Sequence, residues 1–184
     1  MFEFEETFIN GLTVIQPFVY EDDRGTLKKT FEKKIFKENG IDLAAMEEIE
    51  TTSKEGVLRG LHLQTSYSQA KLVRVARGAI YDVAVDLRKG SETFGKWFGI
   101  RLSAENRKML YIQEGFAHGC LILKENTTFY YLCSKSYYPG FDSGIAWNDP
   151  KLKIDWPVDE VRQVILSEKD KHLGTFDDFV KQYR

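Results

Sequence analysis

The chain has 184 residues, with 26 Lys and Arg against 28 Asp and Glu, two Cys and three His. This length predicts one domain over residues 1–184, and the near-balanced charge argues against a nucleic-acid-binding protein, which usually carries a basic excess. The few cysteines and the absence of a signal-like or membrane-spanning apolar run predict a cytoplasmic protein that does not bind membranes.

Short stretches rich in aromatic and β-branched residues recur along the chain, which is typical of strands. In chain order, strands are predicted over 12–19, 57–64, 71–76, 79–87, 97–102, 108–112, 120–123 and 127–134. Helices are expected over 31–39, ending at Gly40, near Ser167, and over 175–181. This pattern predicts an all-β sandwich or barrel with short helices near residues 31–39 and at the C-terminus.

Side chains alternate between the two faces of a regular strand. His62 and Gln64 therefore share one face of their strand, and Arg59 lies on the other. In the strand over 79–87, Asp82 shares a face with Asp86. Each polar face is backed by an apolar one, so we expect the polar faces to be exposed or to line a barrel cavity that holds one ligand.

The histidines argue against a metal centre. Cupin barrels hold metal with a His-x-His pair, but Gln64 stands where the second His would be. Lys71 follows where a carboxylate ligand would be expected, and an ammonium group does not bind a divalent ion. His118 lies in a Gly-flanked segment that is expected to be irregular, and His172 lies in a charged tail. These features predict a cupin cavity without metal or cofactor.

Such a cavity suits proton abstraction beside a carbonyl group. This chemistry needs a base at the carbon and a cation or donor at the oxygen, because the resulting anion delocalises as an enolate. Inversion also needs an acid on the opposite face of the sugar ring. His62 as the base, Lys71 as the enolate stabiliser and a tyrosine as the acid would meet these needs. The alternative is that His62 is a structural residue.

Seven segments then follow one another in a specific order. They are RGLHLQ (59–64), AKLVRV (70–75), YDVAVDLRKGSETFGKW (81–97), LSAEN (102–106), EGFAHG (114–119), GIAWND (144–149) and IDWP (154–157). Over residues 8–171, the chain resembles the dTDP-4-dehydrorhamnose 3,5-epimerase family. This resemblance implies a cupin jelly-roll fold, a homodimer, and metal-independent epimerisation of nucleotide-linked 4-keto-6-deoxy sugars at C3 and C5.

The resemblance also implies roles for four catalytic residues. His62 resembles the base and Asp170 its dyad partner. Tyr131 resembles the acid on the opposite face, and Lys71 the residue that stabilises the enolate. Two local alternatives remain open: Asp170 could only cap a helical turn that begins at Ser167, and strand register decides whether Tyr131 or its neighbour enters the pocket.

Other residues are implied to bind the substrate. Arg59 resembles a diphosphate-binding residue, although it must then lie near the barrel rim or reach another subunit's site. Arg24 resembles a residue supplied by the neighbouring subunit. His118 is expected to contact the sugar and Tyr137 the nucleotide, and Gln64 shares the face of His62.

The expected nucleotide site departs from the family pattern. Thr26 and Lys29 replace an aromatic and a Glu, and Glu47, Glu48 and Ile49 stand where Gln-Asp-Asn is usual. A carboxylate only accepts hydrogen bonds, so it suits the two adjacent donors of guanine better than thymine. Glu47 or Glu48 therefore predicts GDP as the carrier, and Lys29 is expected to bind the nucleotide at the same site.

The leading hypothesis is thus an epimerase of a GDP-linked 4-keto-6-deoxy sugar, such as a heptose of capsule or lipopolysaccharide synthesis. Cys120 replaces an aromatic residue, which predicts a larger cavity for a longer sugar. The alternatives are a dTDP-4-dehydrorhamnose 3,5-epimerase of dTDP-rhamnose synthesis, an enzyme that acts at C3 or C5 alone, and a sugar-nucleotide-binding cupin without catalysis.

Overall fold

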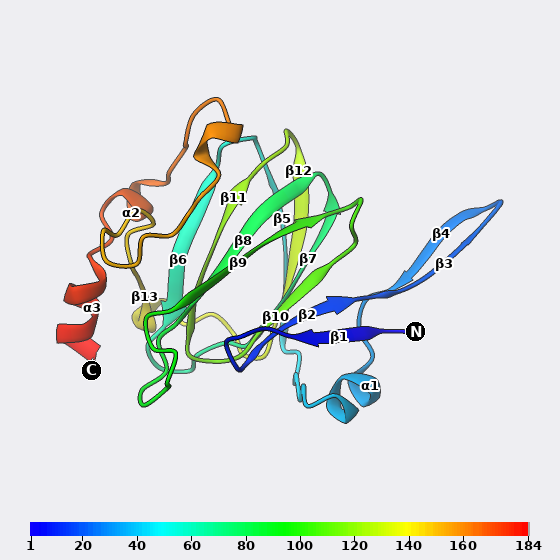
Figure 1. Cartoon of the computed structure of the whole chain (residues 1–184), viewed down its shortest axis with the longest axis horizontal. Coiled ribbons are helices and arrows are strands. Elements are labelled where there is room, and N and C mark those ends of the chain that lie inside the picture. The colour runs from blue at the N-terminus through cyan, green and yellow to red at the C-terminus, as the bar shows by residue number, and fades with distance from the viewer. Residues whose placement is uncertain (184) are drawn as a thin grey trace.

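Two antiparallel sheets face each other in the computed structural model, which describes residues 1–183 (Figure 1). In spatial order, the six-stranded sheet contains β1 (Glu3–Glu6), β2 (Leu12–Gln16), β10 (Met109–Ile112), β7 (Lys71–Arg77), β12 (Thr127–Cys133) and β5 (Glu47–Ser53). The five-stranded sheet contains β13 (Asp142–Gly144), β6 (Leu58–Gln64), β11 (Phe116–Ile122), β8 (Ala79–Asp86) and β9 (Trp97–Ser103). The predicted all-β jelly-roll barrel is confirmed.

Helices are short and lie outside the two sheets. They are α1 (Lys33–Glu38), η1 (Pro139–Phe141), η2 (Val158–Glu160), α2 (Glu168–Lys171) and α3 (Phe176–Tyr183). The expected stop after α1 is confirmed, because Gly40 has a φ of +80°, the left-handed backbone that favours glycine at a helix end. Ser167 caps α2 by accepting a hydrogen bond from the Asp170 backbone N–H.

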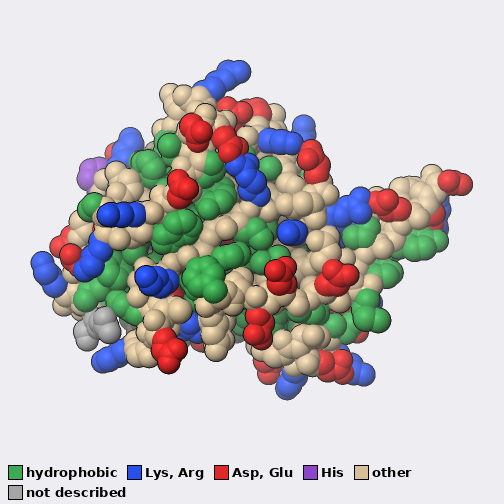
Figure 2. Space-filling view, in the orientation of Figure 1, with side chains coloured by type: hydrophobic (Ala, Val, Ile, Leu, Met, Phe, Trp, Pro, Cys, Tyr) green, Lys and Arg blue, Asp and Glu red, His purple; other side chains and the backbone are tan. Residues whose placement is uncertain are grey.

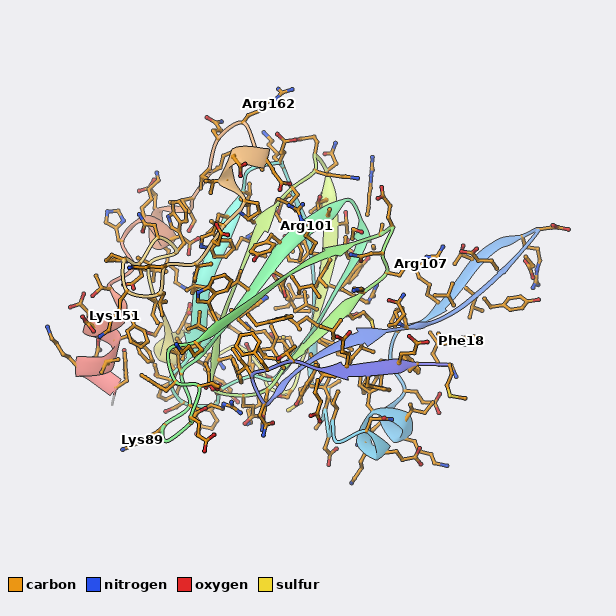
Figure 3. The ribbon with its side chains drawn as sticks, in the orientation of Figure 1. Phe18, Lys89, Arg101, Arg107, Lys151 and Arg162 are labelled. Carbon is orange, nitrogen blue, oxygen red and sulfur yellow. The ribbon has the colours of Figure 1, made fainter. Side chains whose placement is uncertain are left out.

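The N-terminal part of the chain forms a hairpin that projects from the barrel (Figure 1). The prediction of one strand over 12–19 is wrong, because Pro17 interrupts it between β2 and β3 (Phe18–Asp22). β3 pairs with β4 (Gly25–Lys29) across a tight turn at Asp23 and Arg24. An ion pair between Glu21 and Arg107 joins the hairpin to the barrel, and Figure 3 labels Arg107 and Phe18 near the hairpin's base.

Two further differences concern strand boundaries. The segment around His118 is not irregular: it belongs to β11, which is buried along its whole length and pairs with both β6 and β8. β1 and β5 were not predicted, since their charged, mostly exposed sequences lack an apolar alternation. β5 matters for the site because it forms the edge of the sheet beside β12.

The barrel interior is apolar except where the cavity lies. Val73, Ile80, Ala84 and Phe129 are among the buried residues that pack between the two sheets. A second cluster packs the outer face of the five-stranded sheet against the C-terminal segments, and a third packs α1 against the six-stranded sheet. The polar side chains on the inner faces of the strands surround one cavity.

On the face seen in Figure 2, Lys and Arg side chains are dispersed among Asp and Glu and form no continuous basic stripe. No helix within residues 1–183 has the length and apolar character needed to cross a bilayer.

Candidate active site

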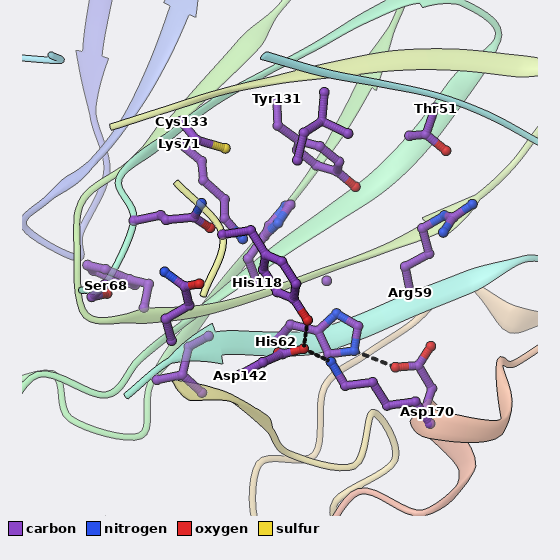
Figure 4. Close-up of a pocket in the computed structure, with 18 of the residues that line it drawn as sticks. Thr51, Arg59, His62, Ser68, Lys71, His118, Tyr131, Cys133, Asp142 and Asp170 are labelled. Atoms are coloured by element: carbon purple, nitrogen blue, oxygen red, sulfur yellow. Dashed lines mark hydrogen bonds and ion pairs between the residues drawn. The ribbon is translucent and has the colours of Figure 1, made fainter. Parts of the chain in front are cut away.

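A cavity of about 360 Å³ opens between the two sheets and is lined by side chains from both (Figure 4). Eight of the twelve predicted site residues line it. They are Arg59, His62, Gln64, Lys71, His118, Tyr131, Tyr137 and Asp170. Side chains of β6, β7 and β12 therefore meet around one space.

His62 and Asp170 form a close pair at this cavity. The Nε2 atom of His62 lies 2.5 Å from Oδ1 of Asp170, and the side chains are 30% and 4% exposed. The other carboxylate oxygen accepts a hydrogen bond from the Ser167 hydroxyl at 2.7 Å. Burial opposes ionisation of Asp170, but the hydrogen bonds from His62 and Ser167 outweigh it and lower the pKa of the carboxyl group.

The two interpretations of Asp170 are thus compatible. Its backbone N–H is capped by Ser167, while its carboxylate holds His62. Nε2 of His62 donates to this carboxylate, and Nδ1 has no hydrogen-bond partner within residues 1–183. An imidazole held in this way keeps a free lone pair, as a general base requires.

A β-bulge brings Arg59 onto the same wall as His62. His118 on β11 lies opposite His62 on β6, but Cys120 lies opposite Arg59, so one extra residue is present in β6. Gly60 occupies the bulge with a φ of +105°, and a Cβ there would meet the backbone oxygen of His118 at 2.5 Å. The prediction that Arg59 lies on the opposite face fails for this reason.

A second histidine–carboxylate pair lies beside the first. Nε2 of His118 is 2.8 Å from Oδ1 of Asp82, and both side chains are buried. The other Asp82 oxygen is buried and has no hydrogen-bond partner in residues 1–183. Asp82 therefore orients His118. Asp86, by contrast, lies outside the cavity and binds Arg88, Ser91 and Thr93.

Lys71 and Tyr131 stand on the opposite wall, on the adjacent strands β7 and β12. Lys71 makes no hydrogen bond or ion pair with any described residue, and burial lowers the pKa of its ammonium group. Burial also raises the pKa of the Tyr131 phenol well above its usual value. The neighbouring Tyr130 points away from the cavity, where the Arg74 guanidinium covers its ring at 4.0 Å.

The cavity rim contains two charged residues that sequence reasoning missed. Lys169 donates a hydrogen bond to Asp142 at 2.5 Å, and the Tyr137 hydroxyl donates to the same carboxylate at 2.7 Å. Lys169 is adjacent to Asp170, so its position carried a signal, but nothing in the sequence around Asp142 did. Both side chains line the cavity with His62.

Gln64 holds the loops at the rim. Its amide nitrogen donates to the backbone oxygens of Tyr67 and Ser136, and its amide oxygen accepts from the Tyr138 N–H. These bonds engage both the nitrogen and the oxygen of the Gln64 amide with other groups of the protein. The predicted substrate contact of Gln64 stays a prediction.

Four predicted substrate-binding residues lie away from the cavity. Arg24 lies in the turn of the projecting hairpin, is 85% exposed and binds Asp22. Lys29 binds Glu32, and Glu48 pairs with Arg74 on the outer face of the sheet. Glu47 accepts hydrogen bonds from the Tyr137 backbone N–H and the side chain of Gln69.

Two predictions drawn from the departures from the family pattern therefore lack a physical basis: GDP as the carrier, and a cavity enlarged at Cys120. The carboxylates of Glu47 and Glu48 already have protein partners, so neither is free in the way that the guanine argument needs. Cys120 does not enlarge the cavity, because its side chain is fully buried behind Tyr131 and is not part of the lining.

The donor set around the cavity does not resemble a metal centre. Within the described chain, no three or more His, Cys, Asp or Glu side chains gather to hold an ion. The arrangement instead offers an oriented imidazole on one wall and an ammonium group with a phenol on the other. These groups can remove a proton, stabilise an oxyanion and deliver a proton from the opposite side.

The chain is similar to known nucleotide-sugar epimerases over nearly its whole length. The family model described as dTDP-4-dehydrorhamnose 3,5-epimerase matches residues 6–178. A dTDP-4-dehydrorhamnose 3,5-epimerase of Methanothermobacter thermautotrophicus is 50% identical over 171 residues, which cover 93% of this chain and 92% of the relative.

Solved structures give the same relationship. The dTDP-6-deoxy-D-glucose-3,5-epimerase of Legionella pneumophila, in complex with dTDP-4-keto-L-rhamnose, has a TM-score of 0.92 and 40% identity over 96% of this chain and 94% of its own. ChmJ of Streptomyces bikiniensis, a 3′-monoepimerase in complex with dTDP-quinovose, has a TM-score of 0.89 and 32% identity over 96% and 89%. The same fold therefore serves epimerases that are named for two centres and for one.

Proposed function

The chain belongs to the dTDP-4-dehydrorhamnose 3,5-epimerase family, and we propose that it inverts C3 and C5 of a dTDP-linked 4-keto-6-deoxy sugar. Its membership makes it an isomerase of a nucleotide sugar. The single observation that carries the detailed proposal is that His62 and Tyr131 face one cavity from opposite sheets. Inversion needs a base and an acid on opposite faces of the sugar ring.

The proposed reaction begins at His62. Asp170 holds Nε2 of the imidazole, so Nδ1 takes the proton from a carbon next to the C4 ketone. The electron pair moves onto the ketone oxygen and forms an enolate, which the Lys71 ammonium group stabilises. C3 and C5 both flank this ketone, so the same enolate-stabilising group serves both centres.

Tyr131 completes the inversion. Burial raises the pKa of its phenol, so the hydroxyl stays protonated at neutral pH and can give its proton to the opposite face of the carbon. The resulting phenolate regains a proton from solvent, and His62 releases the one that it took. No oxidant or reductant is consumed.

The proposal of dTDP replaces the expectation of GDP. The Legionella relative was solved with a dTDP sugar, and the carboxylates on which the guanine argument rested bind other protein groups. Calorimetric titration of the protein with dTDP and with GDP tests this choice. We expect tighter binding of dTDP, and tighter binding of GDP would overturn it.

We further propose that Arg59 binds the diphosphate and that the chain forms a homodimer in which Arg24 reaches the partner's cavity. The hairpin projects away from its own barrel (Figure 1), and the Arg24 side chain is 85% exposed, which supports a role outside its own site. Sedimentation should give the mass of a dimer, and Arg24→Gln should weaken dTDP binding without changing that mass. A monomer would contradict this arrangement.

Proton exchange tests the reaction itself. Incubation of the protein with dTDP-4-keto-6-deoxy-D-glucose in D₂O should introduce deuterium at both C3 and C5, as followed by NMR, and should yield the sugar inverted at both carbons, dTDP-4-keto-L-rhamnose. Deuterium at one carbon alone would favour the single-centre alternative. Binding of dTDP without any exchange would identify the protein as a non-catalytic cupin.

A further inference from the structure

Cys120 is buried directly behind the hydroxyl group of Tyr131. Its Sγ atom lies 3.9 Å from the phenolic oxygen, and its side chain is 0% exposed. No other described residue hydrogen-bonds the Tyr131 hydroxyl. Among the described residues, the proposed acid therefore has one hydrogen-bond partner at its reactive atom, and that partner is a thiol.

The ring of Tyr131 is held firmly, in contrast to its hydroxyl group. His118 packs edge-on against the ring with centroids 5.5 Å apart, and Phe129 packs against it at 5.1 Å, also edge-on. These contacts fix the direction of the phenol across the barrel. What remains free is the rotation of the O–H bond, which decides whether the proton points into the cavity or towards β11.

The thiol can direct that proton only as a donor. Burial raises the pKa of Cys120, and the nearby Asp82 carboxylate acts in the same direction, so the sulfur keeps its proton. An S–H group is a weak donor and a weak acceptor. When it donates to the phenolic oxygen, the O–H of Tyr131 is left to point away from Cys120.

We propose that Cys120 is a positioning residue for Tyr131, whose thiol donates a weak hydrogen bond to the phenolic oxygen and directs the phenolic proton into the cavity. After proton transfer, the same S–H supports the phenolate until solvent restores its proton. No covalent bond to sulfur forms and no electrons are exchanged. This inference rests on the proposed epimerase function, because it acts through the acid of that reaction.

Paired substitutions separate the donor from the bulk of the side chain. Cys120→Val fills the space without a donor, whereas Cys120→Ala removes the donor together with most of the bulk. Loss of a weak hydrogen bond predicts an inversion rate about three- to tenfold lower for Cys120→Val. Cys120→Ala should show a fall of similar size, because it lacks the same donor.

Exchange without inversion is the decisive readout. In D₂O, His62 can return deuterium to the face from which it took the proton, so the sugar becomes labelled but not inverted. Cys120→Val should raise the ratio of labelled, uninverted sugar to inverted sugar about three- to tenfold, while exchange by His62 continues. A change in packing alone would lower exchange and inversion together.

The outcomes are distinguishable. A wild-type protein with no turnover would overturn the proposed function and this inference with it. Wild-type turnover with an unchanged ratio in Cys120→Val, or with a rise in Cys120→Ala alone, would overturn the role of Cys120 alone. If Cys120→Val does not fold, Cys120→Ala removes the same donor, and an unchanged ratio in that variant relative to the wild type would overturn the role.

Discussion

The ionisable groups on the two walls of the cavity differ in whether they have a charged partner. On the wall built by β6, β11 and β8, each imidazole is held by a carboxylate: His62 by Asp170 and His118 by Asp82. On the wall built by β7 and β12, Lys71 makes no ion pair among the described residues, and the Tyr131 hydroxyl has a thiol as its one hydrogen-bond partner among them. Hydrogen bonds thus orient the imidazole side chains of the first wall, whereas burial shifts the pKa values of the groups on the second.

The difference has a chemical meaning. A base must present a lone pair in a fixed direction, and a carboxylate at the far nitrogen does this for His62. The groups that meet the developing enolate must instead respond to charge that appears during the reaction. Desolvation favours the neutral forms of Lys71 and Tyr131. An oxyanion nearby therefore stabilises the ammonium form of Lys71, while Tyr131 keeps the proton that it is to give.

His62→Asn should break the oriented wall with the largest effect. Asparagine cannot act as the base, so turnover should fall by about 10³-fold, within the usual range for general acid–base catalysis. Because His62 is expected to act on the sugar, dTDP affinity by calorimetry should stay within about twofold. Turnover within tenfold of the wild type would contradict the assignment of the base.

Lys71→Gln tests the buried wall. Loss of the ammonium group should lower turnover by about 10²-fold, as expected for the loss of an oxyanion-stabilising group. Since burial lowers the Lys71 pKa, the wild-type rate should fall on the alkaline side at a pH below 10.5, the ordinary value for lysine. Lys71→Arg keeps its charge, so its alkaline limb should move upwards. A limb that stays unchanged in Lys71→Arg would exclude Lys71 as its source.

Asp170→Asn should weaken the orientation of His62 without removing the base. A neutral amide replaces a charge-assisted hydrogen bond, which predicts about a tenfold fall in turnover. Ser167 should still cap α2, so thermal unfolding should change little. A large loss of stability with unchanged turnover would mean that Asp170 serves the fold only.

Asp86→Asn provides the matched change outside the cavity. Asp86 is buried, but hydrogen bonds from Arg88, Ser91 and Thr93 outweigh the cost of burial and lower its pKa to about 2. A carboxyl group whose pKa is lower in the folded state stabilises the protein at pH values above its unfolded-state pKa. This contribution is lost as the pH falls from about 4 to about 2. The substitution should cost about 2 kcal/mol at pH 7, a cost that fades in that window, with turnover unchanged. Lost turnover in a folded variant would show that the cavity depends on this turn.

Much of the site could be predicted because strand alternation is a local rule. It brought His62 and Gln64 to one face, and Lys71 and Tyr131 also face the cavity. It failed for Arg59, because the bulge at Gly60 depends on pairing with β11, which lies far away in sequence. Local sequence does not encode a partner strand's register.

Burial and long-range partners account for the other failures. β5 has a charged sequence because one face of this edge strand is turned outward, so it carried no apolar signal. The pairing of Glu48 with Arg74, and of Glu47 with Tyr137, joins strands or loops distant in the chain. Taken without these partners, the two carboxylates look free to bind guanine, whereas in the fold they are already engaged.

Tyr131→Phe tests most directly whether the two walls act on opposite faces of the sugar. In D₂O, the variant keeps His62 and Lys71, so it should still exchange deuterium into uninverted dTDP-4-keto-6-deoxy-D-glucose at C3 and C5. Inversion should fall by at least about 10²-fold, because no acid remains on the opposite wall. Inversion at an unchanged rate, or exchange that is lost in proportion with inversion, would contradict the two-wall account.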